Sequence, residues 1–499
     1  MNDHHHPVVI TAQGAVRGLR RNGVAAFLGA PYAAPPRGAG RFAPPEPHAP
    51  WDGIRDATAP GPTAPQSERG LGDVDMSPYF GTGWSRGAEY LTVNVWTPAR
   101  NDDGGLPVMV FVHGGGFVAG STRAALYDGS AFARDGVVLV SLNYRLGIAG
   151  FLDLPGAPAN RGLLDVVAAL RWVRENIAAF GGDPRNVTLF GQSAGATVVG
   201  GVLADPRAAG LVRRAIVQSG SGLGAFSPEQ AARVTAAAAD ALGVAPHADA
   251  FAELSDGRLV EAASRLTGID LRTATHHDPL IGLSPFSLVL DAQPAVSVAA
   301  GLGADVDLLV GTNIEEGNLY LVPVDRYATS TLDDVRAVAA SAHPEPARLV
   351  ETYRTARPAA SAGELRSAVL GNALFGAGSR ALADAHAART TSTTTTHRYE
   401  FTWRSHALGG ELGAAHAMEL PFVFDLAHLP GLRGPQALLG PDAPPADLAD
   451  RMHAAWVRFA RTGDPGWAPY SLTRRTTMRI GAEWTPVDDP RGEELRAWD

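Results

Sequence analysis

Apolar residues follow two different patterns along the first part of the chain. Residues 108–112 and 137–142 are apolar almost throughout, which predicts strands that are buried on both faces of a sheet. Residues 91–98 alternate apolar and polar side chains instead, so we expect a half-buried strand there. Residues 8–10 and 15–18 are typical of an opening hairpin.

Helical spacing lies between two of these strands. From residue 163 to residue 180, apolar side chains recur three or four positions apart, and the segment closes with Gly-Gly-Asp-Pro at 181–184. This helix would join the strand at 137–142 to a further apolar strand at 187–190. A strand, a helix and a strand in this order predict parallel pairing.

Strands and helices also alternate in the second half of the chain. Buried strands are predicted at residues 215–218 and 308–311, and a last one at 399–403. The segments at about 226–275 and 330–390 have helical patterns. We expect both to be insertions over the carboxyl edge of the sheet, where folds of this kind bind their ligands.

The composition fits one large domain. No break in composition marks a boundary, so we expect a single α/β domain over residues 7–490, with a mostly parallel central sheet and helices on both faces. Hydrophobic residues make up 45% of the chain and charged residues 19%, which is enough to bury a large core.

Charge and cysteine content narrow the possible functions. The formal net charge of -9 provides no basic surface for nucleic acid or an anionic membrane. The chain has no cysteine, which excludes disulfides, thiolate catalysis and cysteine-ligated metals. Serine, histidine and the carboxylates therefore remain as catalytic candidates.

The N-terminus and the length of the apolar runs bear on location. Residues 1–7 lack the basic segment and apolar stretch of a signal peptide, and no apolar run reaches the roughly 18 residues that span a bilayer. We expect a cytoplasmic monomer without a membrane or nucleic-acid partner.

The strand at 187–190 leads directly into Gly191-Gln192-Ser193-Ala194-Gly195 and then into an apolar helix. A serine on such a sharp turn projects its hydroxyl above the sheet edge, and the flanking glycines allow the strand and the helix to pack closely. Ser193 is therefore the candidate nucleophile. The alternative is a turn of small residues without chemistry, and the strand-turn-helix context argues against it.

A serine nucleophile needs a base and a third group that orients the base. In α/β hydrolases these residues follow in the order serine, acid, histidine, each after a strand. Glu315 and Glu316 follow the strand predicted at 308–311, and His416 follows the one at 399–403. Order and placement agree with this scheme.

Segments along most of the chain match a known pattern. They are residues 27–32, 94–98, 113–117, 143–147, 180–184, 191–195, 218–221, 315–317, 416–422 and 459–465. In this order they resemble the type-B carboxylesterases, the cholinesterase and para-nitrobenzyl esterase family of α/β hydrolases, and above all its bacterial members. The resemblance implies the α/β-hydrolase fold, with helical insertions over the active site.

The resemblance also assigns the catalytic roles. It implies that Ser193 is the nucleophile, Glu316 the acid and His416 the base. Glu315 is the alternative acid, although we expect it to be a solvated loop carboxylate.

Three other histidines are rival bases. His397, His406 and His428 lie on or near connecting loops in the predicted layout. We expect them to be exposed, as isolated histidines often are.

A glycine-rich loop at residues 113–116 has two possible functions. It lacks the Gly-Lys-Ser/Thr ending of a phosphate-binding loop, so an oxyanion hole fits better. The backbone N–H groups of Gly115, Gly116 and Ala194 would then converge on the developing alkoxide. Ser219 matches a serine that hydrogen-bonds into the triad in this family, with an ordinary turn after a strand as the alternative.

Some positions depart from the family pattern. Residues 88–91 read Ala-Glu-Tyr-Leu where Glu-Asp-Cys-Leu is usual, which removes a disulfide and the acidic partner expected for Arg41. Gln192 stands where glutamate is commoner, so any ion pair made by that glutamate is lost. His4–His6 and residues 276–278 could ligate a metal, but a tail and a polar loop are the simpler interpretations.

Together these observations predict a serine carboxylic-ester hydrolase that acts through an acyl-enzyme on a small-molecule ester and needs no cofactor or metal. The alternatives are a catalytically inactive binding or adhesion module of the same fold, and an amidase or thioesterase of narrow specificity. Trp84, Phe286 and Phe375 are expected in the substrate pockets. The sequence does not identify the substrate.

Overall fold

One large β-sheet organises the computed structural model, which describes residues 6–99, 104–389 and 394–499. Its strands are β3 (Leu19–Arg21), β4 (Val24–Pro31), β6 (Thr92–Pro98), β7 (Leu106–Val112), β8 (Val138–Leu142), β9 (Gly182–Gln192), β10 (Arg214–Gln218), β11 (Asp307–Asn313), β12 (Thr396–Phe401), β13 (Thr476–Ile480) and β14 (Trp484–Asp488). Their order is β14-β13-β12-β11-β10-β9-β7-β8-β6-β4-β3. The strands from β8 to β13 pair in parallel, and antiparallel strands complete both ends. The predicted, mostly parallel central sheet is confirmed.

Strand β7 shows why the central strands are apolar throughout. Val108, Val110 and Val112 contribute to one hydrophobic core, whereas Met109 and Phe111 contribute to another. Successive side chains of a strand point to opposite faces, so each face of the sheet has its own core. A strand in this position has no solvent-facing side and therefore no polar alternation.

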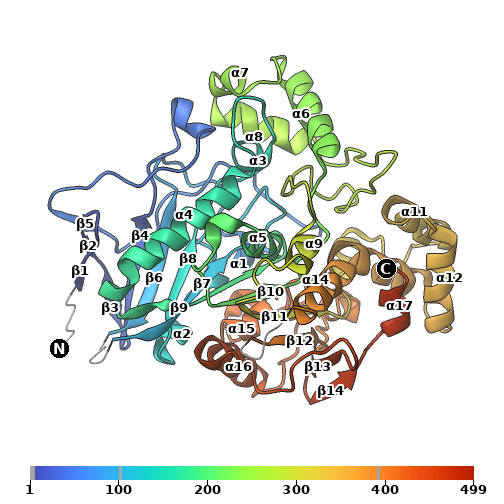
Figure 1. The fold of residues 1–499 in the computed structure, drawn as a ribbon. Coiled ribbons are helices and arrows are strands. Elements are labelled where there is room, and N and C mark those ends of the chain that lie inside the picture. The colour runs from blue at the N-terminus through green and yellow to red at the C-terminus, as the bar shows by residue number, and fades with distance from the viewer. Residues whose placement is uncertain (1–5, 100–103, 390–393) are drawn as a thin grey trace.

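Helices cover both faces. The core that contains Val110 also receives α4 (Arg161–Asn176) and α5 (Ala194–Leu203), and the core that contains Phe111 receives α2 (Ser130–Arg134) and α16 (Leu448–Thr462) (Figure 1). Shorter helices near the sheet are α1 (Ser77–Phe80), α3 (Gly147–Phe151), α9 (Pro294–Ala299), α10 (Asn318–Leu321), α15 (Leu420–Val423) and α17 (Gly492–Arg496). Among the described residues, no helix is both long and apolar enough to cross a membrane.

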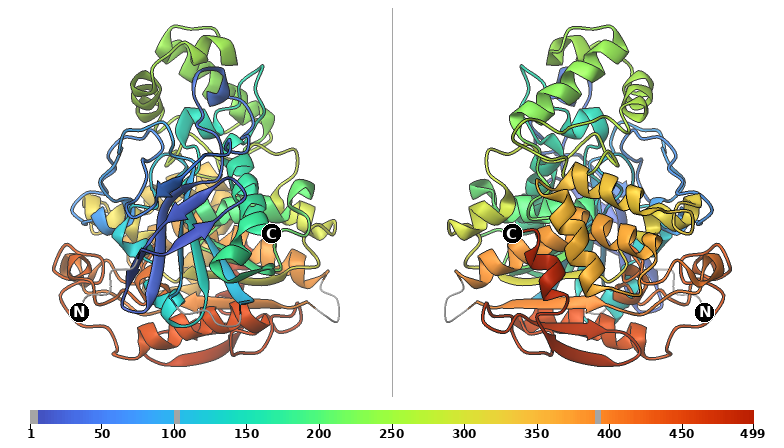
Figure 2. Two further views of the ribbon diagram at one scale, coloured as in Figure 1. Left: turned by 90° about the vertical axis from the view of Figure 1, so that its left-hand side faces the viewer. Right: turned by 90° about the vertical axis from the view of Figure 1, so that its right-hand side faces the viewer.

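Two helical groups follow β10 and β11 along the chain. Residues 226–275 contain α6 (Pro228–Leu242), α7 (Ala248–Ala252) and α8 (Asp256–Arg265), and residues 330–390 contain α11 (Leu332–Ala342), α12 (Pro346–Ala356), α13 (Ala362–Gly371) and α14 (Ala377–Ala387). In Figure 2, α6, α7 and α8 form the top of the molecule, and the C-terminal strands form its base. The helical patterns of both segments are confirmed.

The opening hairpin is present but separate from the main sheet. Strand β1 (Val8–Ile10) pairs antiparallel with β2 (Ala15–Arg17). Strand β2 also pairs with β5 (Ile54–Asp56), which gives a small three-stranded sheet.

The prediction of a half-buried strand at residues 91–98 is wrong. Strand β6 lies between β8 and β4, and its residues from Thr92 to Thr97 are buried. Its polar positions have hydrogen-bond partners instead of solvent: the Asn94 amide accepts from Gly29 N at 2.8 Å and donates to the Thr122 carbonyl at 3.2 Å. Satisfied polar groups can be buried at little cost, so alternation here does not signal exposure.

The strand predicted at residues 399–403 is not the last strand of the sheet. β13 and β14 continue the sheet beyond β12. Their residues include Thr476, Thr477, Arg479 and Thr485, and so few apolar positions gave no strand signal.

Arg41 has an acidic partner after all. Its Nε lies 3.2 Å from Asp256 Oδ1 at the start of α8, and its Nη1 donates to the Leu254 carbonyl at 2.6 Å. The acid comes from a helix far along the chain, which is why the sequence pattern around residues 88–91 did not reveal it.

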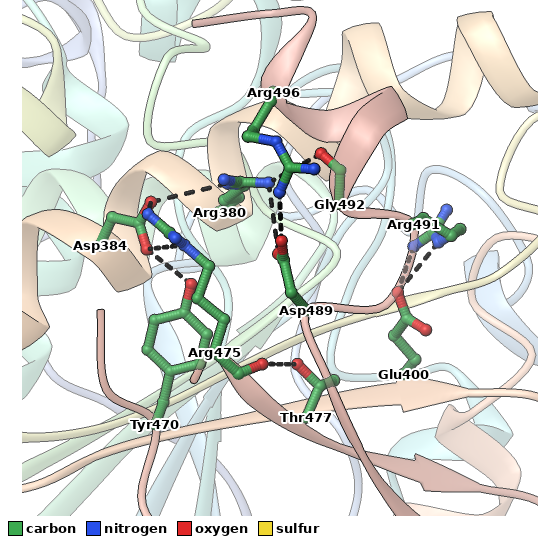
Figure 3. Close-up of polar contacts among 10 residues, drawn as sticks. All are labelled: Arg380, Asp384, Glu400, Tyr470, Arg475, Thr477, Asp489, Arg491, Gly492 and Arg496. Carbon is green, nitrogen blue, oxygen red and sulfur yellow. Dashed lines mark hydrogen bonds and ion pairs between the residues drawn. The ribbon is translucent and has the colours of Figure 1, made fainter. Parts of the chain in front are cut away.

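Buried charges fasten the C-terminal residues to the sheet (Figure 3). Glu400 of β12 accepts hydrogen bonds from Arg491 Nε at 3.0 Å and Nη2 at 2.6 Å, and Arg479 Nε lies 3.3 Å away. Asp489 forms a second link, 3.6 Å from Arg380 Nη1 of α14. Burial raises the pKa of Glu400, but Arg491 and Arg398 outweigh this effect and the pKa is lowered overall.

We expect Glu400→Gln to lower the free energy of unfolding by about 3 kcal/mol or more, because it leaves buried arginines without their counter-charge. Urea denaturation followed by circular dichroism measures the loss. Glu493→Gln is the matched control, since Glu493 is exposed on α17. Equal stability of the two variants would contradict the role of Glu400.

The same contact predicts a pH dependence. Because the pKa of Glu400 is lower in the folded protein than its ordinary value of 4.5, its contribution is present above that value and is lost as the pH falls below it. The difference in unfolding free energy between the wild type and Glu400→Gln should therefore shrink on acidification. Denaturation curves at pH 7 and at about pH 4 test this sign.

Candidate active site

The candidate residues gather at one edge of the sheet. Ser193 directly follows β9, Ser219 directly follows β10, Glu316 lies three residues after β11, and His416 lies in the loop after β12. These four strands are neighbours and run in parallel. Their carboxyl ends therefore meet at the same edge, which is where open α/β sheets bind ligands.

The turn at Ser193 is strained. Ser193 has φ 57° and ψ -127°, a combination that residues with a side chain rarely adopt. The glycines on either side make the turn possible: a Cβ on Gly195 would lie 2.1 Å from the Val112 carbonyl oxygen, and a Cβ on Gly191 would lie 2.7 Å from the Gly195 carbonyl carbon. The predicted strand-turn-helix arrangement is confirmed.

Glu316 and His416 are in direct contact. Glu316 Oε2 lies 2.6 Å from His416 Nδ1, and both side chains are almost fully buried. The short distance is typical of a hydrogen bond with charge on one partner. It fixes the imidazole ring and leaves Nε2 free of the carboxylate.

The other oxygen of Glu316 is also satisfied. Glu316 Oε1 accepts from the Ser219 hydroxyl at 2.6 Å and from Asn313 N at 2.7 Å. Three donors thus surround a carboxylate that has little access to water. Ser219 therefore makes the contact that the resemblance implies, rather than forming a plain turn.

A second buried carboxylate, Glu419, lies close to Glu316. The Asn313 amide donates to Glu419 Oε2 at 2.8 Å, and the Gln218 amide donates to Glu419 Oε1 at 3.2 Å. Burial and then the negative charge of Glu316 raise the pKa of Glu419. The environment of Glu419 thus favours its neutral form.

Gln192 contacts the imidazole from the other side. Its Nε2 lies 3.1 Å from His416 Nε2. Since an amide nitrogen only donates, this contact requires an unprotonated Nε2 and places the ring proton on Nδ1, facing Glu316. Among the described residues, the partner of Nε2 is this amide rather than the Ser193 hydroxyl.

Glu315 does not reach His416 and is not a solvated loop carboxylate. It pairs with Arg404, and its Oε2 accepts from Ala414 N at 2.8 Å. Its side chain is only 18% exposed. Glu315 therefore ties the loop that carries His416 to the end of β11.

The three rival histidines lie apart from Ser193, but the prediction that all are exposed is wrong. His406 and His428 are exposed, whereas His397 is buried in β12. Burial lowers the pKa of His397 to about 4. Strand β12 begins at Thr396, three residues before the strand predicted at 399–403, and so it includes His397.

The glycine-rich loop follows β7 and borders Ser193. Gly115 and Gly116 have φ values of 112° and 63°, and their N–H groups make no hydrogen bond within the described residues. Ala194 opens α5, so its N–H has no partner within the helix. These three donors line the same cavity as Ser193 and His416.

The cavity above Ser193 is largely apolar. Its walls include Leu71, Phe80, Leu319, Tyr320, Leu374 and Phe375. Phe375 stacks on the His416 ring with centroids 4.2 Å apart and an angle of 7° between the planes. Of the three aromatic residues expected here, Phe375 lines the cavity and the other two do not: Phe286 is buried in the main core, and Trp84 stacks with Arg86.

The metal alternatives receive no support from geometry. Within residues 6–99, 104–389 and 394–499, no group of three or more histidines, cysteines or acids could hold an ion. His4 and His5 lie outside the described residues.

Sequence reasoning missed several contributors to the site. Asn313 and Tyr320 carry no motif of their own. Glu419 lies within the matched segment 416–422, which could have drawn attention to it, and Gln192 was noted only as a departure. Their contacts depend on the meeting of distant loops, which a local pattern does not report.

Comparison with known proteins gives one consistent result. The model of the carboxylesterase family matches residues 5–498. The para-nitrobenzyl esterase of Bacillus subtilis (strain 168) is 36% identical, over 98% of each chain. The phenmedipham hydrolase of Pseudarthrobacter oxydans is 34% identical, over 96% of each. The solved structure of a Geobacillus stearothermophilus carboxylesterase has a TM-score of 0.84 at 34% identity and covers 99% of this chain and 100% of its own.

We expect Gly195→Ala to destabilise the protein by about 1–3 kcal/mol or more, because its Cβ would overlap the backbone at the end of β7. Gly200→Ala is the matched control on the same helix, since its Cβ would meet nothing closer than Pro294 Cβ at 3.7 Å. The control should be neutral or up to about 1 kcal/mol more stable. Thermal unfolding measures the stability of both variants. A Gly195→Ala variant as stable as the wild type would contradict the close packing at this position.

Proposed function

The chain belongs to the carboxylesterase family, and we propose that it hydrolyses carboxylic esters with Ser193, His416 and Glu316 as its catalytic triad. The observation that carries this proposal is the 2.6 Å contact between Glu316 Oε2 and His416 Nδ1 beside a cavity that Ser193 lines. Small-molecule esters are the substrates implied by the family. We further propose that residues 7–490 act as one unit, with 226–275 and 330–390 as insertions.

Each triad member has a distinct task in this mechanism. His416 Nε2 takes the Ser193 proton, and the serine oxygen attacks the ester carbonyl carbon. The imidazolium then returns the proton to the leaving alcohol, and Ser193 retains the acyl group. Water, activated in the same way, releases the acid and restores the serine.

The negative charge on the oxygen of the tetrahedral intermediate is stabilised by hydrogen-bond donors that are already positioned before the reaction. We assign this task to the N–H groups of Gly115, Gly116 and Ala194, which are free to donate into the cavity. Such preorganised donors stabilise an oxyanion without reorganisation during the reaction. The positive φ of both glycines lets the loop turn its N–H groups inward.

The contacts also bear on the alternatives. A binding module has no need for a buried carboxylate with three donors that faces a histidine in an apolar cavity. An amidase or thioesterase would use the same triad, so these activities remain alternatives for the same residues. Steady turnover of para-nitrophenyl acetate separates an enzyme from a binding module.

We expect Ser193→Ala to abolish labelling by an organophosphate and to lower kcat by several orders of magnitude. Mass spectrometry of the labelled peptide identifies the modified residue. A label on another serine would contradict the assignment.

Glu316→Gln should lower kcat by about 10³–10⁴, because the amide cannot stabilise the imidazolium. Glu315→Gln should cost less than about tenfold in kcat, since Glu315 faces Arg404 and not His416. Both variants are measured on one activated ester, with circular dichroism as the folding control. If Glu315→Gln were the more impaired variant, the acid would be misassigned.

Gln192→Glu should move the acid limb of the pH profile of kcat/KM upward by about one pH unit. A carboxylate 3.1 Å from Nε2 would stabilise the protonated imidazole, which cannot act as a base. Gln192→Met removes the donor without adding charge and serves as the control. An unchanged midpoint in Gln192→Glu would show that this side chain does not act on His416.

A further inference from the structure

Arg69 introduces an uncompensated positive charge into the candidate active site. It lies on the loop between β5 and α1 and lines both the cavity of Ser193 and an adjoining cavity of about 310 Å³. Among the described residues, no acid lies within ion-pair distance of it. Asp256, the acid that lines the adjoining cavity, is already paired with Arg41.

The guanidinium lies against the glycine-rich loop. Arg69 Nη1 donates to the Gly115 carbonyl at 2.8 Å, and a Cβ on Gly116 would lie 2.7 Å from Nη1 and 3.2 Å from Nη2. Glycine at 116 therefore leaves the space that the guanidinium occupies. The Phe80 ring lies under the same group, with Cζ 5.9 Å from the ring centroid.

Most donors of Arg69 are unused. A guanidinium has five N–H groups, and the Gly115 carbonyl is its hydrogen-bond acceptor within the described residues. Two structural arginines in the same chain differ in this respect. Arg145 binds Asp165 and two carbonyls, and Arg161 donates to four carbonyls.

Accessibility distinguishes Arg69 from Arg398, a buried arginine of β12. The guanidinium nitrogens of Arg398 are enclosed and have no hydrogen-bond partner. Nε and Nη2 of Arg69 also lack a partner but are not enclosed, so a ligand can reach them. Burial lowers the pKa of Arg69, yet arginine stays charged at neutral pH, and an anion would offset the cost of burying this charge.

The adjoining cavity suggests the shape of such a ligand. Apart from Arg69 and Asp256 its walls are mostly apolar, including Val118, Leu146, Ile148, Leu259, Val260 and Ala263. Leu71, Leu283 and Tyr320 line both cavities together with Arg69. The guanidinium therefore lies in the wall that the two cavities share.

We propose that Arg69 is a specificity residue that selects esters carrying a carboxylate, with an apolar remainder in the adjoining cavity. The proposal rests on the proposed ester hydrolysis at Ser193. Arg69 offers the planar, two-pronged donor set that matches a carboxylate. The carboxylate can belong to the acyl part or to the alcohol part of the ester.

The test compares charged esters with neutral counterparts in two arms. The acyl arm uses mono-(4-nitrophenyl) glutarate and methyl 4-nitrophenyl glutarate. The alcohol arm uses 4-acetoxybenzoate and methyl 4-acetoxybenzoate. The readout is the ratio of kcat/KM for the charged ester to that for the neutral one, after subtraction of spontaneous hydrolysis.

Arg69→Met should reduce this ratio by about tenfold or more in at least one arm, because it removes the charge and the paired donors. Arg69→Lys should retain part of the ratio, since it keeps the charge but not the planar fork. Arg354→Gln is the matched control: Arg354 pairs with Glu351 on the exposed face of α12, so its ratio should equal that of the wild type. The arm that responds identifies the part of the ester that carries the carboxylate.

Two results would overturn the proposal. In one, Arg69→Met leaves the ratio unchanged in both arms. In the other, it lowers kcat/KM for charged and neutral esters by the same factor, which would mean that Arg69 only supports the glycine-rich loop. A wild type that hydrolyses none of the four esters would instead refute the proposed function, as would an equally active Ser193→Ala.

Discussion

The rest of the site depends on one backbone constraint, the strained turn at Ser193. The turn is possible because Gly191 and Gly195 leave no side chain between the end of β7 and the start of α5. The cost of a positive φ at serine, on the order of 1–3 kcal/mol, is offset by the packing of β9 and α5 into the main core.

The two buried acids at the carboxyl edge of the sheet, Glu316 and Glu419, differ in the number of hydrogen bonds that they accept. Glu316 accepts from three donors, whereas burial and the charge of Glu316 raise the pKa of the neighbouring Glu419. Two anions side by side in an apolar environment would repel each other strongly. The raised pKa of Glu419 reduces this repulsion beside the carboxylate that faces His416.

Arginines in this acidic protein serve two different purposes. Arg145 and Arg491 are buried against carboxylates, and they connect segments far apart in the chain. Arg69 has a carbonyl partner instead and is open to a cavity, so its charge is available to a ligand. The partners and the accessibility of each arginine therefore indicate whether its role is structural or in ligand recognition.

The sequence by itself determined the fold class, the order of the central strands along the chain, and the positions of Ser193, Glu316 and His416 relative to strand ends. These features are local, because apolar runs, turn glycines and helical spacing each involve residues that are close together in the sequence. Predictions from the sequence were wrong or missing where the burial or pairing of a strand depends on segments far apart in the chain. β13 and β14 carry too few apolar residues to be recognised. β6 is buried between β8 and β4, where its asparagine has partners in β4 and in the loop at Thr122. His397 is buried because β12 begins before the predicted strand.

Only the tertiary structure decided which side chains meet. In the folded chain Gln192 contacts the His416 imidazole, Glu315 pairs with Arg404, and Arg69 lines two cavities. A side-chain contact depends on the relative position of two elements to within about one ångström, since hydrogen bonds weaken steeply outside their narrow range of length and angle. Residue spacing along the chain does not contain that distance.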